Sequence, residues 1–151
     1  MTHFRLATTS DAVRVDDLVQ RAYAKYIPVI GYHPKPMQCD YQTQTAEGLV
    51  HLLVDEQDSL LGLIVLYDEG EQIYIDNVAV EPALQGGGHG KRLLDYAQKL
   101  ARQQGKQRLT LLTNAKMKFN IALYNLYGFY ETQRAPGNHP DSLLVHMAMD
   151  L

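Results

Sequence analysis

One stretch of the sequence restricts the possible folds most: residues 78–94, in which glycines join an apolar, strand-like run to a helix-like run. The glycines are Gly86, Gly87, Gly88 and Gly90. Glycine readily adopts positive φ and lets a ligand approach the main chain closely. The first N–H groups of a helix have no partner within it and carry partial positive charge. The segment therefore predicts a cradle for phosphate oxygens, although a glycine turn can also serve only as a connection.

Three phosphate-binding patterns compete for this turn. A P-loop requires glycine at the position of Gln85 and Ser or Thr at the position of Arg92, so it does not fit. A Rossmann fingerprint does not fit either, because no count from Gly86 or Gly88 ends on a glycine. The pattern that fits is Gln-x-x-Gly-x-Gly, with Gln85, Gly88 and Gly90 at its fixed positions.

The rest of the chain predicts alternating strands and helices around this turn. Apolar periodicity, capping residues and Gly or Pro stops predict the following elements in chain order: a strand at 3–7, a helix from about residue 12 that stops before Pro28, an irregular segment at 28–41, a short helix at 40–46, strands at 49–54, 60–67 and 72–80, a helix at 90–104, a strand at 108–113, a helix at 115–127, and strands at 129–133 and 143–149.

This order predicts an α+β fold with a mixed sheet. The consecutive strands before the glycine turn should pair in antiparallel fashion, and the strand–helix–strand unit after it should give a parallel pair. Helices should then cover both faces of the sheet. A length of 151 residues fits one domain, residues 1–151.

Composition excludes several function classes. The formal net charge of −3 gives no support for nucleic-acid binding, which usually needs a basic face. The one cysteine, Cys39, permits no intramolecular disulfide and favours the cytoplasm. The first seven residues lack the apolar core of a signal peptide, and no apolar run is long enough to span a membrane. The histidines lack metal-ligand spacing, so we predict no metal site.

A second motif lies in the predicted helix at 115–127, which ends in Tyr124-Asn-Leu-Tyr-Gly128-Phe129. Together with Val78-Ala79-Val80, Pro82 and the Gln-x-x-Gly-x-Gly pattern, it resembles the GNAT superfamily of N-acetyltransferases. The resemblance covers nearly the whole chain in the order of elements and is strongest over residues 73–129. It implies the GNAT-type acyl-CoA fold and acetyl-CoA as co-substrate.

The resemblance also implies which residues hold acetyl-CoA. Main-chain N–H groups from Gly86 to Lys91 would bind the diphosphate, and the strand before the turn would bind the pantetheine amides. A departure concerns Met117, which stands where many relatives have an asparagine that contacts coenzyme A. Asn114 and Asn120 are the amides available instead. The predicted cofactor-binding residues are Val78, Ala79, Val80, Gln85, Gly86, Gly87, Gly88, His89, Gly90, Lys91, Asn114 and Asn120.

The expected catalytic residues are Tyr124 and Asp76. By resemblance Tyr124 protonates the departing thiolate, and a phenol with a reference pKa of about 10 carries the necessary proton at neutral pH. The alternative for Tyr124 is a packing role beside an inward face of Phe119, Leu123 and their apolar neighbours Ala122 and Leu126. Asp76 is an acid in an otherwise apolar strand and is the candidate base that takes the proton of the amine, or else merely a hydrogen-bonded strand carboxylate.

The predicted reaction is direct attack of a primary amine on the thioester, without an acyl-enzyme. The alternatives are a non-catalytic acyl-CoA-binding or sensory domain on the same fold and a nucleotide-phosphate enzyme. The sequence does not identify the acceptor amine, which leaves polyamines, amino acids, aminoglycoside-like amines and protein amines as candidates. We expect the segments at 26–41 and 134–141 to shape its pocket, no membrane or nucleic-acid partner, and a possible homodimer.

Overall fold

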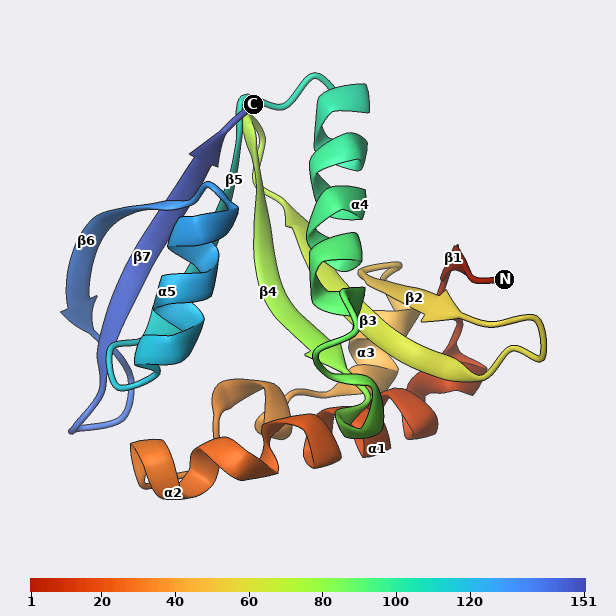
Figure 1. Ribbon diagram of the computed structural model, residues 1–151, viewed down its shortest axis with the longest axis horizontal. Helices are drawn as coiled ribbons and strands as arrows, with labels where there is room; N and C mark the ends of the chain where they lie inside the picture. Colours follow the sequence, from red (N-terminus) through yellow and green to blue (C-terminus); the bar gives the residue numbers. More distant parts are fainter.

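The computed structural model describes residues 1–151 and contains one seven-stranded sheet with five α-helices (Figure 1). The elements, in chain order, are β1 (His3–Leu6), α1 (Ala12–Tyr23), α2 (Ile27–Ile30), α3 (Tyr41–Ala46), β2 (Val50–Val54), β3 (Leu60–Asp68), β4 (Gln72–Val80), α4 (His89–Gln103), β5 (Arg108–Asn114), α5 (Lys118–Tyr127), β6 (Tyr130–Pro136) and β7 (Leu143–Asp150). Short 3-10 turns lie between several of them, including one at Lys35–Gln38.

The strand order is β1-β2-β3-β4-β5-β7-β6. All neighbouring strands are antiparallel except β4 and β5, which pair in parallel with Ile73 opposite Leu109. A parallel pair needs a crossover, and α4 supplies it. The mixed α+β sheet predicted from the order of elements is therefore confirmed.

Two apolar clusters lie on the two faces of the sheet, because side chains alternate along each strand. On one face, Ile64 of β3 packs in a cluster with Leu93 and Ala97 of α4. On the other face, Leu63 and Val65 of β3 pack in a cluster with residues of α1. Burying a leucine or isoleucine fully contributes about 1.5–3 kcal/mol, so both helices are held mainly by these contacts.

A β-bulge at Asp76 changes this alternation within β4. Leu66 of β3 lies opposite Ile75, and Val65 lies opposite Asn77, so Asp76 has no partner in the pairing with β3. On a regular strand Ile75 and Ala79, four residues apart, would face the same side. Because of the bulge, Ile75 faces the α4 cluster and Ala79 faces the α1 cluster. Bulges often redirect side chains beside functional sites. Here the bulge turns Asn77 towards α1, where its amide bonds with tyrosine hydroxyls, and turns the next residue along β4 to the α4 side.

Three predicted boundaries need correction. The first helix ends at Tyr23 as a regular α-helix, but helical turns continue through Pro28 into α2. Pro28 is tolerated because it lies in the first turn of α2, where its missing N–H would have had no partner. The later helix begins at Lys118 rather than residue 115, because Asn114 starts a turn in which its side-chain oxygen accepts the Lys116 N–H at 2.9 Å. Strand β6 extends to Pro136.

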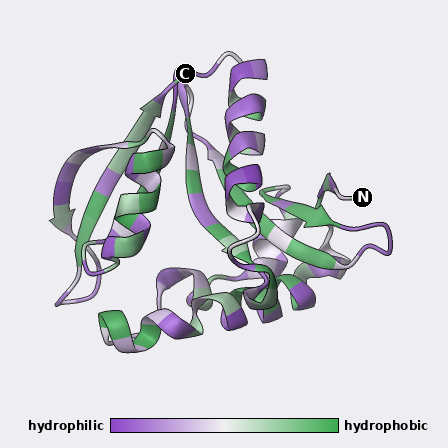
Figure 2. Ribbon diagram, viewed as in Figure 1, coloured by the Kyte–Doolittle hydropathy of each residue, from purple (hydrophilic) through white to green (hydrophobic).

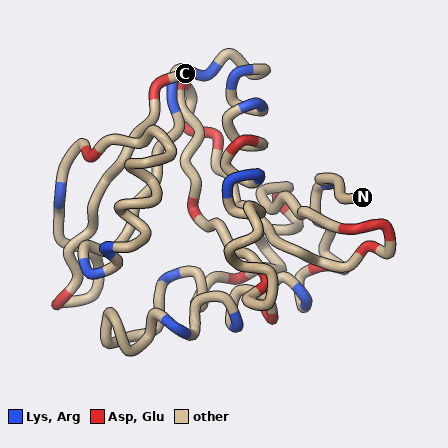
Figure 3. The backbone as a smooth tube through the Cα atoms, in the orientation of Figure 1, with Lys and Arg blue, Asp and Glu red and all other residues tan.

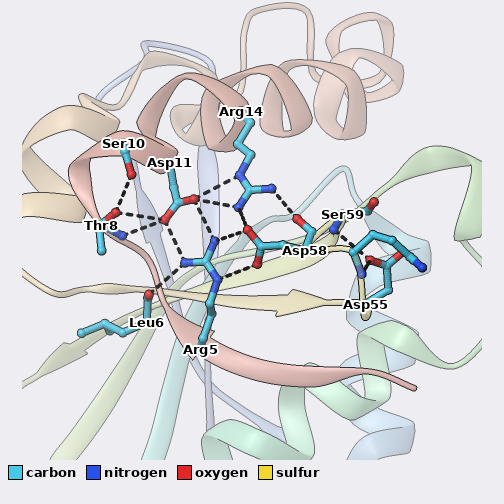
Figure 4. A network of polar contacts seen from close by, with 10 residues as sticks. Arg5, Leu6, Thr8, Ser10, Asp11, Arg14, Asp55, Asp58 and Ser59 are labelled. Carbon is cyan, nitrogen blue, oxygen red and sulfur yellow. Dashed lines mark hydrogen bonds and ion pairs between the residues drawn. The ribbon is translucent and has the colours of Figure 1, made fainter.

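A charged network joins the start of α1 to the β2–β3 hairpin (Figure 4). The buried carboxylate of Asp11 accepts hydrogen bonds of 2.8–3.1 Å from the guanidinium groups of Arg5 and Arg14 and from the Thr8 N–H. Both arginines also bond with Asp58 of the hairpin. The hydrogen bonds from Arg5 hold the pKa of Asp11 well below its usual range. This network fixes the start of α1 to β1 and to the β2–β3 hairpin.

Charges of both signs are spread over the molecule, as Figure 3 shows. No helix is both long and apolar enough to cross a membrane.

Candidate active site

The site lies where β4 and β5 separate. Their pairing ends at Ile75 opposite Leu111, and β4 then continues to Val80 without a partner on that side (Figure 1). Two clefts open along the unpaired part of β4, and α5 lies between them. Val78, Asn120 and Tyr124 line both clefts, so these three residues mark where the clefts meet.

The first cleft has a volume of about 610 Å³ and runs from β4 to the glycine turn. Helix α5 forms one of its walls, and Figure 2 shows hydrophobic bands along this helix between polar ones. We call it the turn cleft. Its lining residues are Lys25, Tyr26, Val78, Val80, Leu84, Gln85, Gly86, His89, Gly90, Lys91, Leu94, Phe119, Asn120, Leu123, Tyr124, Leu126 and Tyr127.

The glycine turn presents a row of free main-chain donors. The N–H groups of Gly86, Gly88, His89, Gly90 and Lys91 make no hydrogen bond within the protein. Gly86 and Gly88 adopt φ of +86°, which a residue with a side chain adopts only with strain. A Cβ built on Gly86, Gly88 or Gly90 would meet no protein atom within 4 Å. The turn therefore has the geometry of an anion cradle at a helix N-terminus.

Two of the polar side chains around the turn, Gln85 and Lys91, make hydrogen bonds or ion pairs within the protein, whereas one ring nitrogen of His89 does not. Gln85 accepts a hydrogen bond from Lys25 at 2.7 Å and donates one to the carbonyl of Val80 at 3.3 Å. The ammonium of Lys91 pairs with Asp95 one helical turn away, at 2.9 Å. His89 has a buried Nδ1 atom without a partner.

The predicted cofactor residues of β4 fall into two groups. Val78 and Val80 line the turn cleft, whereas the side chain of Ala79 is buried on the opposite face against α1. Ala79 can therefore take part only through its main chain. Gly87 does not line the turn cleft, and its N–H bonds with the carbonyl of Leu84 at 3.3 Å.

The second cleft has a volume of about 470 Å³ and lies on the other side of α5. Its walls come from six separate parts of the chain: Tyr23 of α1, the segment at 30–38, the middle of β4, the end of β5, the segment at 117–124 and the segment at 137–144. We call it the loop cleft. The segments at 26–41 and 134–141, which the sequence marked as pocket-forming, both contribute to it.

Asp76 lines the loop cleft and is the buried member of an ion pair. Its side chain is 4% exposed, and its Oδ1 atom accepts a hydrogen bond from the ammonium of Lys35 at 3.1 Å. The amide of Gln44 approaches its other oxygen at 3.5 Å. The pKa of Tyr74 is raised well above its usual range, mainly by burial and secondly by the negative charge of Asp76. A carboxylate of this kind has the geometry to bind an ammonium group and to accept its proton.

Tyr124 lies at the junction of the two clefts. Its hydroxyl makes no hydrogen bond within the protein, and its ring packs edge-on against Phe129 at 5.7 Å between centroids. Burial raises the pKa of Tyr124 to about 12. The phenol therefore stays protonated at neutral pH and is free to donate to a ligand atom at the junction.

The inward face of α5 differs from the sequence prediction. Ile121, Tyr124 and Tyr127 pack against the core, whereas Phe119 and Leu126 are 75% and 86% exposed. Their apolar neighbours Ala122 and Leu123 are exposed as well. The helix turns its most apolar stripe towards the turn cleft and solvent, so apolar periodicity alone indicated the wrong face.

The two candidate asparagines occupy different places. Asn120 lines both clefts, and its side-chain oxygen accepts a hydrogen bond from the Tyr26 hydroxyl at 3.3 Å. Asn114 lines only the loop cleft, where its amide donates to the Tyr32 hydroxyl at 2.8 Å. The expected contact of Asn114 with pantetheine in the turn cleft therefore has no support in this geometry.

Three residues of the loop cleft were not singled out from the sequence. Lys35 pairs with Asp76, and Tyr32 stacks on His139 with ring centroids 3.9 Å apart. The sequence indicated only the segments that carry these residues, 26–41 and 134–141, and not the residues themselves. No group of three or more His, Cys, Asp or Glu side chains is arranged to hold a metal ion.

Comparisons with known proteins agree with this architecture. The model of the acetyltransferase (GNAT) family matches residues 14–129. An IAA acetyltransferase of Azospirillum brasilense is 29% identical over 114 residues, which cover 74% of each chain.

Two solved structures show the same fold. The ribosomal-protein-S18-alanine N-acetyltransferase of Escherichia coli superposes with a TM-score of 0.80 at 21% identity, covering 99% of this chain and 94% of that one. The PaiA N-acetyltransferase of Thermoplasma acidophilum, in complex with coenzyme A, superposes with a TM-score of 0.78 at 13% identity, covering 100% and 99%.

The class of protein that fits this site is an acyl-CoA-dependent transferase. Its features here are the divided sheet, the glycine turn and the two adjoining clefts. Because the family model matches well over half of the chain, the protein belongs to the GNAT family and is an acetyltransferase. This family uses acetyl-CoA as acetyl donor.

Proposed function

We propose that the protein moves the acetyl group of acetyl-CoA to a primary amine by direct attack, with residues 1–151 acting as one N-acetyltransferase domain. The observation that carries the proposal is the meeting of two clefts at Tyr124, Asn120 and Val78. A donor in the turn cleft and an acceptor in the loop cleft would approach each other at this junction. Holding two reactants together in this way removes much of the entropic barrier to their reaction.

The turn cleft fits acetyl-CoA by its own chemistry. The row of unpaired N–H groups at Gly86 and from Gly88 to Lys91 suits a diphosphate, since each would otherwise lack a partner. Val78 and Val80 offer apolar contact and unpaired strand edges to a pantetheine arm. The PaiA structure with coenzyme A on the same fold supports this assignment.

The loop cleft fits the amine. In the proposed step the amine nitrogen attacks the thioester carbonyl, so that a C–N bond forms and the C–S bond breaks. Asp76 takes the proton that the amine loses, directly or through water. Tyr124 gives its proton to the departing sulfur, which leaves as the free thiol of coenzyme A. The N-acetyltransferase names of both solved relatives support an amine as acceptor.

The test is to measure the release of free thiol from acetyl-CoA with a panel of primary amines, beside calorimetric titration with coenzyme A. We expect coenzyme A to bind and at least one amine to release thiol, with the acetylated amine visible by mass spectrometry. Binding without thiol release from any amine would instead indicate a non-catalytic acyl-CoA-binding domain. Absence of binding at millimolar coenzyme A would refute the assignment of the turn cleft.

A further inference from the structure

The loop cleft contains a single pair of opposite full charges. Among its 24 lining residues, Lys35 and Asp76 are the only Lys, Arg, Asp or Glu side chains. They come from different elements: Asp76 from the bulge of β4, and Lys35 from the 3-10 turn after α2. A binding site with one cation and one anion complements a ligand that carries one charge of each sign.

The two partners differ in how firmly they are held. The Asp76 side chain is 4% exposed, whereas that of Lys35 is 72% exposed and bonds only with Asp76. The aliphatic stem of a lysine is flexible, and its ammonium is a compact charge that readily exchanges partners. Asp76 is therefore a fixed anionic point, and Lys35 is a cation that can move to a ligand group nearby.

We propose that Lys35 and Asp76 together recognise a small acceptor that bears one amine and one acidic group, such as an amino acid. The acceptor ammonium takes the place of the Lys35 ammonium at Asp76, and Lys35 pairs with the acidic group. This inference rests on the proposed function and defines its substrate class. The exchange leaves every charge with a partner, so neither Lys35 nor the acceptor is desolvated without compensation.

Polycationic acceptors fit this cleft poorly. A polyamine or aminoglycoside that placed one ammonium at Asp76 would find no second carboxylate among the lining residues. Its remaining ammonium groups would lie near the displaced Lys35, and like charges in a partly desolvated site repel each other. Charge balance therefore selects against the most basic of the acceptor classes that the sequence left open.

The walls of the loop cleft also limit acceptor size. Tyr32 and His139 reach across from the two loop segments and stack with an interplanar angle of 10°. Asn114 fixes the Tyr32 hydroxyl at 2.8 Å. The loop that carries His139 is tightly built, because a Cβ on Gly137 would overlap Ser142 Oγ. A bridged cleft of about 470 Å³ is in the range that binds small molecules.

The experiment compares amino acids with their carboxamides, which keep the amine and the side chain but lack the acidic group. Thiol release is measured for the wild type, Lys35→Met and Lys35→Arg, with Lys99→Met on the exposed face of α4 as matched control. We expect Lys35→Met to raise KM for the amino acids about 10-fold at nearly constant kcat and to leave KM for the amides unchanged. Lys35→Arg should retain the preference, and Lys99→Met should behave as the wild type.

Three results would overturn the inference. The wild type could acetylate only polyamines or protein amines, or it could prefer the amides to the amino acids. Alternatively, Lys35→Met could change KM for acids and amides equally, as a purely structural lysine would. In each of these cases acetyl transfer still occurs, so the proposed function stands while the inference fails. Absence of acetyl transfer to any amine would refute both.

Discussion

The two clefts differ in what they present to a ligand. The turn offers the cleft unpaired main-chain N–H groups of one short segment, those of Gly86 and of Gly88 to Lys91, and the cleft adds apolar side chains. The loop cleft offers side chains from six separate parts of the chain, with Asp76 and Lys35 as its charges. Main-chain donors are the same whatever the neighbouring side chains, so the first cleft suits an invariant ligand. Side-chain recognition changes with each substitution, so the second suits a ligand that varies between relatives.

The comparison predicts that substitutions at the junction affect chemistry, those in the loop cleft affect acceptor use, and those in the turn affect coenzyme A binding. Residues outside both clefts should affect only stability.

The largest effect is expected for Tyr124→Phe. Loss of the phenolic proton should lower kcat by about 10²–10⁴-fold, as for other general acids, while the dissociation constant of coenzyme A changes little. The hydroxyl makes no hydrogen bond within the protein, so the melting temperature should stay the same. Steady-state kinetics, calorimetry and thermal melting check the three expectations.

A matched control for this variant is Tyr130→Phe, whose hydroxyl bonds with Asp150 at 2.9 Å outside both clefts. It should keep the kcat of the wild type. A Tyr124→Phe enzyme with full kcat at neutral pH would remove Tyr124 from the role of acid and leave it a packing role.

The next effect is expected for Asp76→Asn, which keeps the shape of the side chain but cannot take a proton. We expect kcat/KM to fall by about 10²-fold at neutral pH. An amine with a reference pKa near 10.4 becomes increasingly neutral as the pH rises, so the loss should shrink towards high pH. The Tyr124→Phe deficit should not shrink in this way, since it concerns the leaving group.

Pre-steady-state or steady-state rates between pH 7 and about 10 measure this difference. Asp17→Asn, on the exposed side of α1, is the matched control and should follow the wild-type profile. A deficit of Asp76→Asn that stays constant over the whole range would contradict its role as base.

The same difference between clefts explains what the sequence could reveal. The glycine turn could be recognised in the sequence because its residues are contiguous. Gln85, Gly88 and Gly90 lie in one short segment, and the glycines determine its local backbone conformation. Lys35 could not be placed, because it meets Asp76 from 41 residues away and only the fold brings the two together. The bulge at Asp76 was equally hidden, since it appears only in the register between β3 and β4.

The mixed sheet with its one parallel pair, and most of the elements, followed from the periodicity and order of the elements, and the error on α5 has a physical cause. Phe119, Leu123 and Leu126 have the helical spacing of a buried stripe, yet they line the turn cleft. Apolar spacing indicates a face that avoids water, and it does not distinguish the protein core from the wall of a ligand site.

The third prediction concerns stability and tests the charged network around Asp11, which lies outside both clefts. Asp11→Asn leaves the guanidinium groups of Arg5 and Arg14 without their buried partner and should lower the free energy of unfolding by about 2 kcal/mol, given that both arginines are partly exposed. Because the native pKa of Asp11 is depressed, its contribution is fully present above the unfolded pKa of about 4 and is lost as the pH falls towards the native value. Urea denaturation of wild type and variant should therefore differ at pH 7 and converge in acid.

Kinetic constants are the control for this third prediction. At a temperature where both proteins are folded, Asp11→Asn should keep the wild-type kcat and KM, because Asp11 lines neither cleft. A change in either constant would mean that the N-terminal network is coupled to the site.

The smallest effect is expected at Gly90, and it separates the ligand-binding role of the turn from its role in the fold. A Cβ on Gly90 meets no protein atom within 4 Å, and φ there is not positive. Gly90→Ala should therefore leave stability unchanged or raise it by up to about 1 kcal/mol, as alanine does inside a helix. Gly90 lines the turn cleft, so the added methyl group should crowd the diphosphate and weaken coenzyme A binding about 10-fold, or about 1.4 kcal/mol.

Gly88→Ala adds the same methyl group two residues earlier, where φ is +86°. That backbone conformation costs a residue with a Cβ about 1–2 kcal/mol, so this variant should lose stability where Gly90→Ala does not. Calorimetry with coenzyme A and thermal melting of both variants distinguish strain in the turn from obstruction of the ligand. Unchanged affinity in Gly90→Ala would mean that coenzyme A does not lie against this turn, and the contrast between a main-chain cleft and a side-chain cleft would lose its basis.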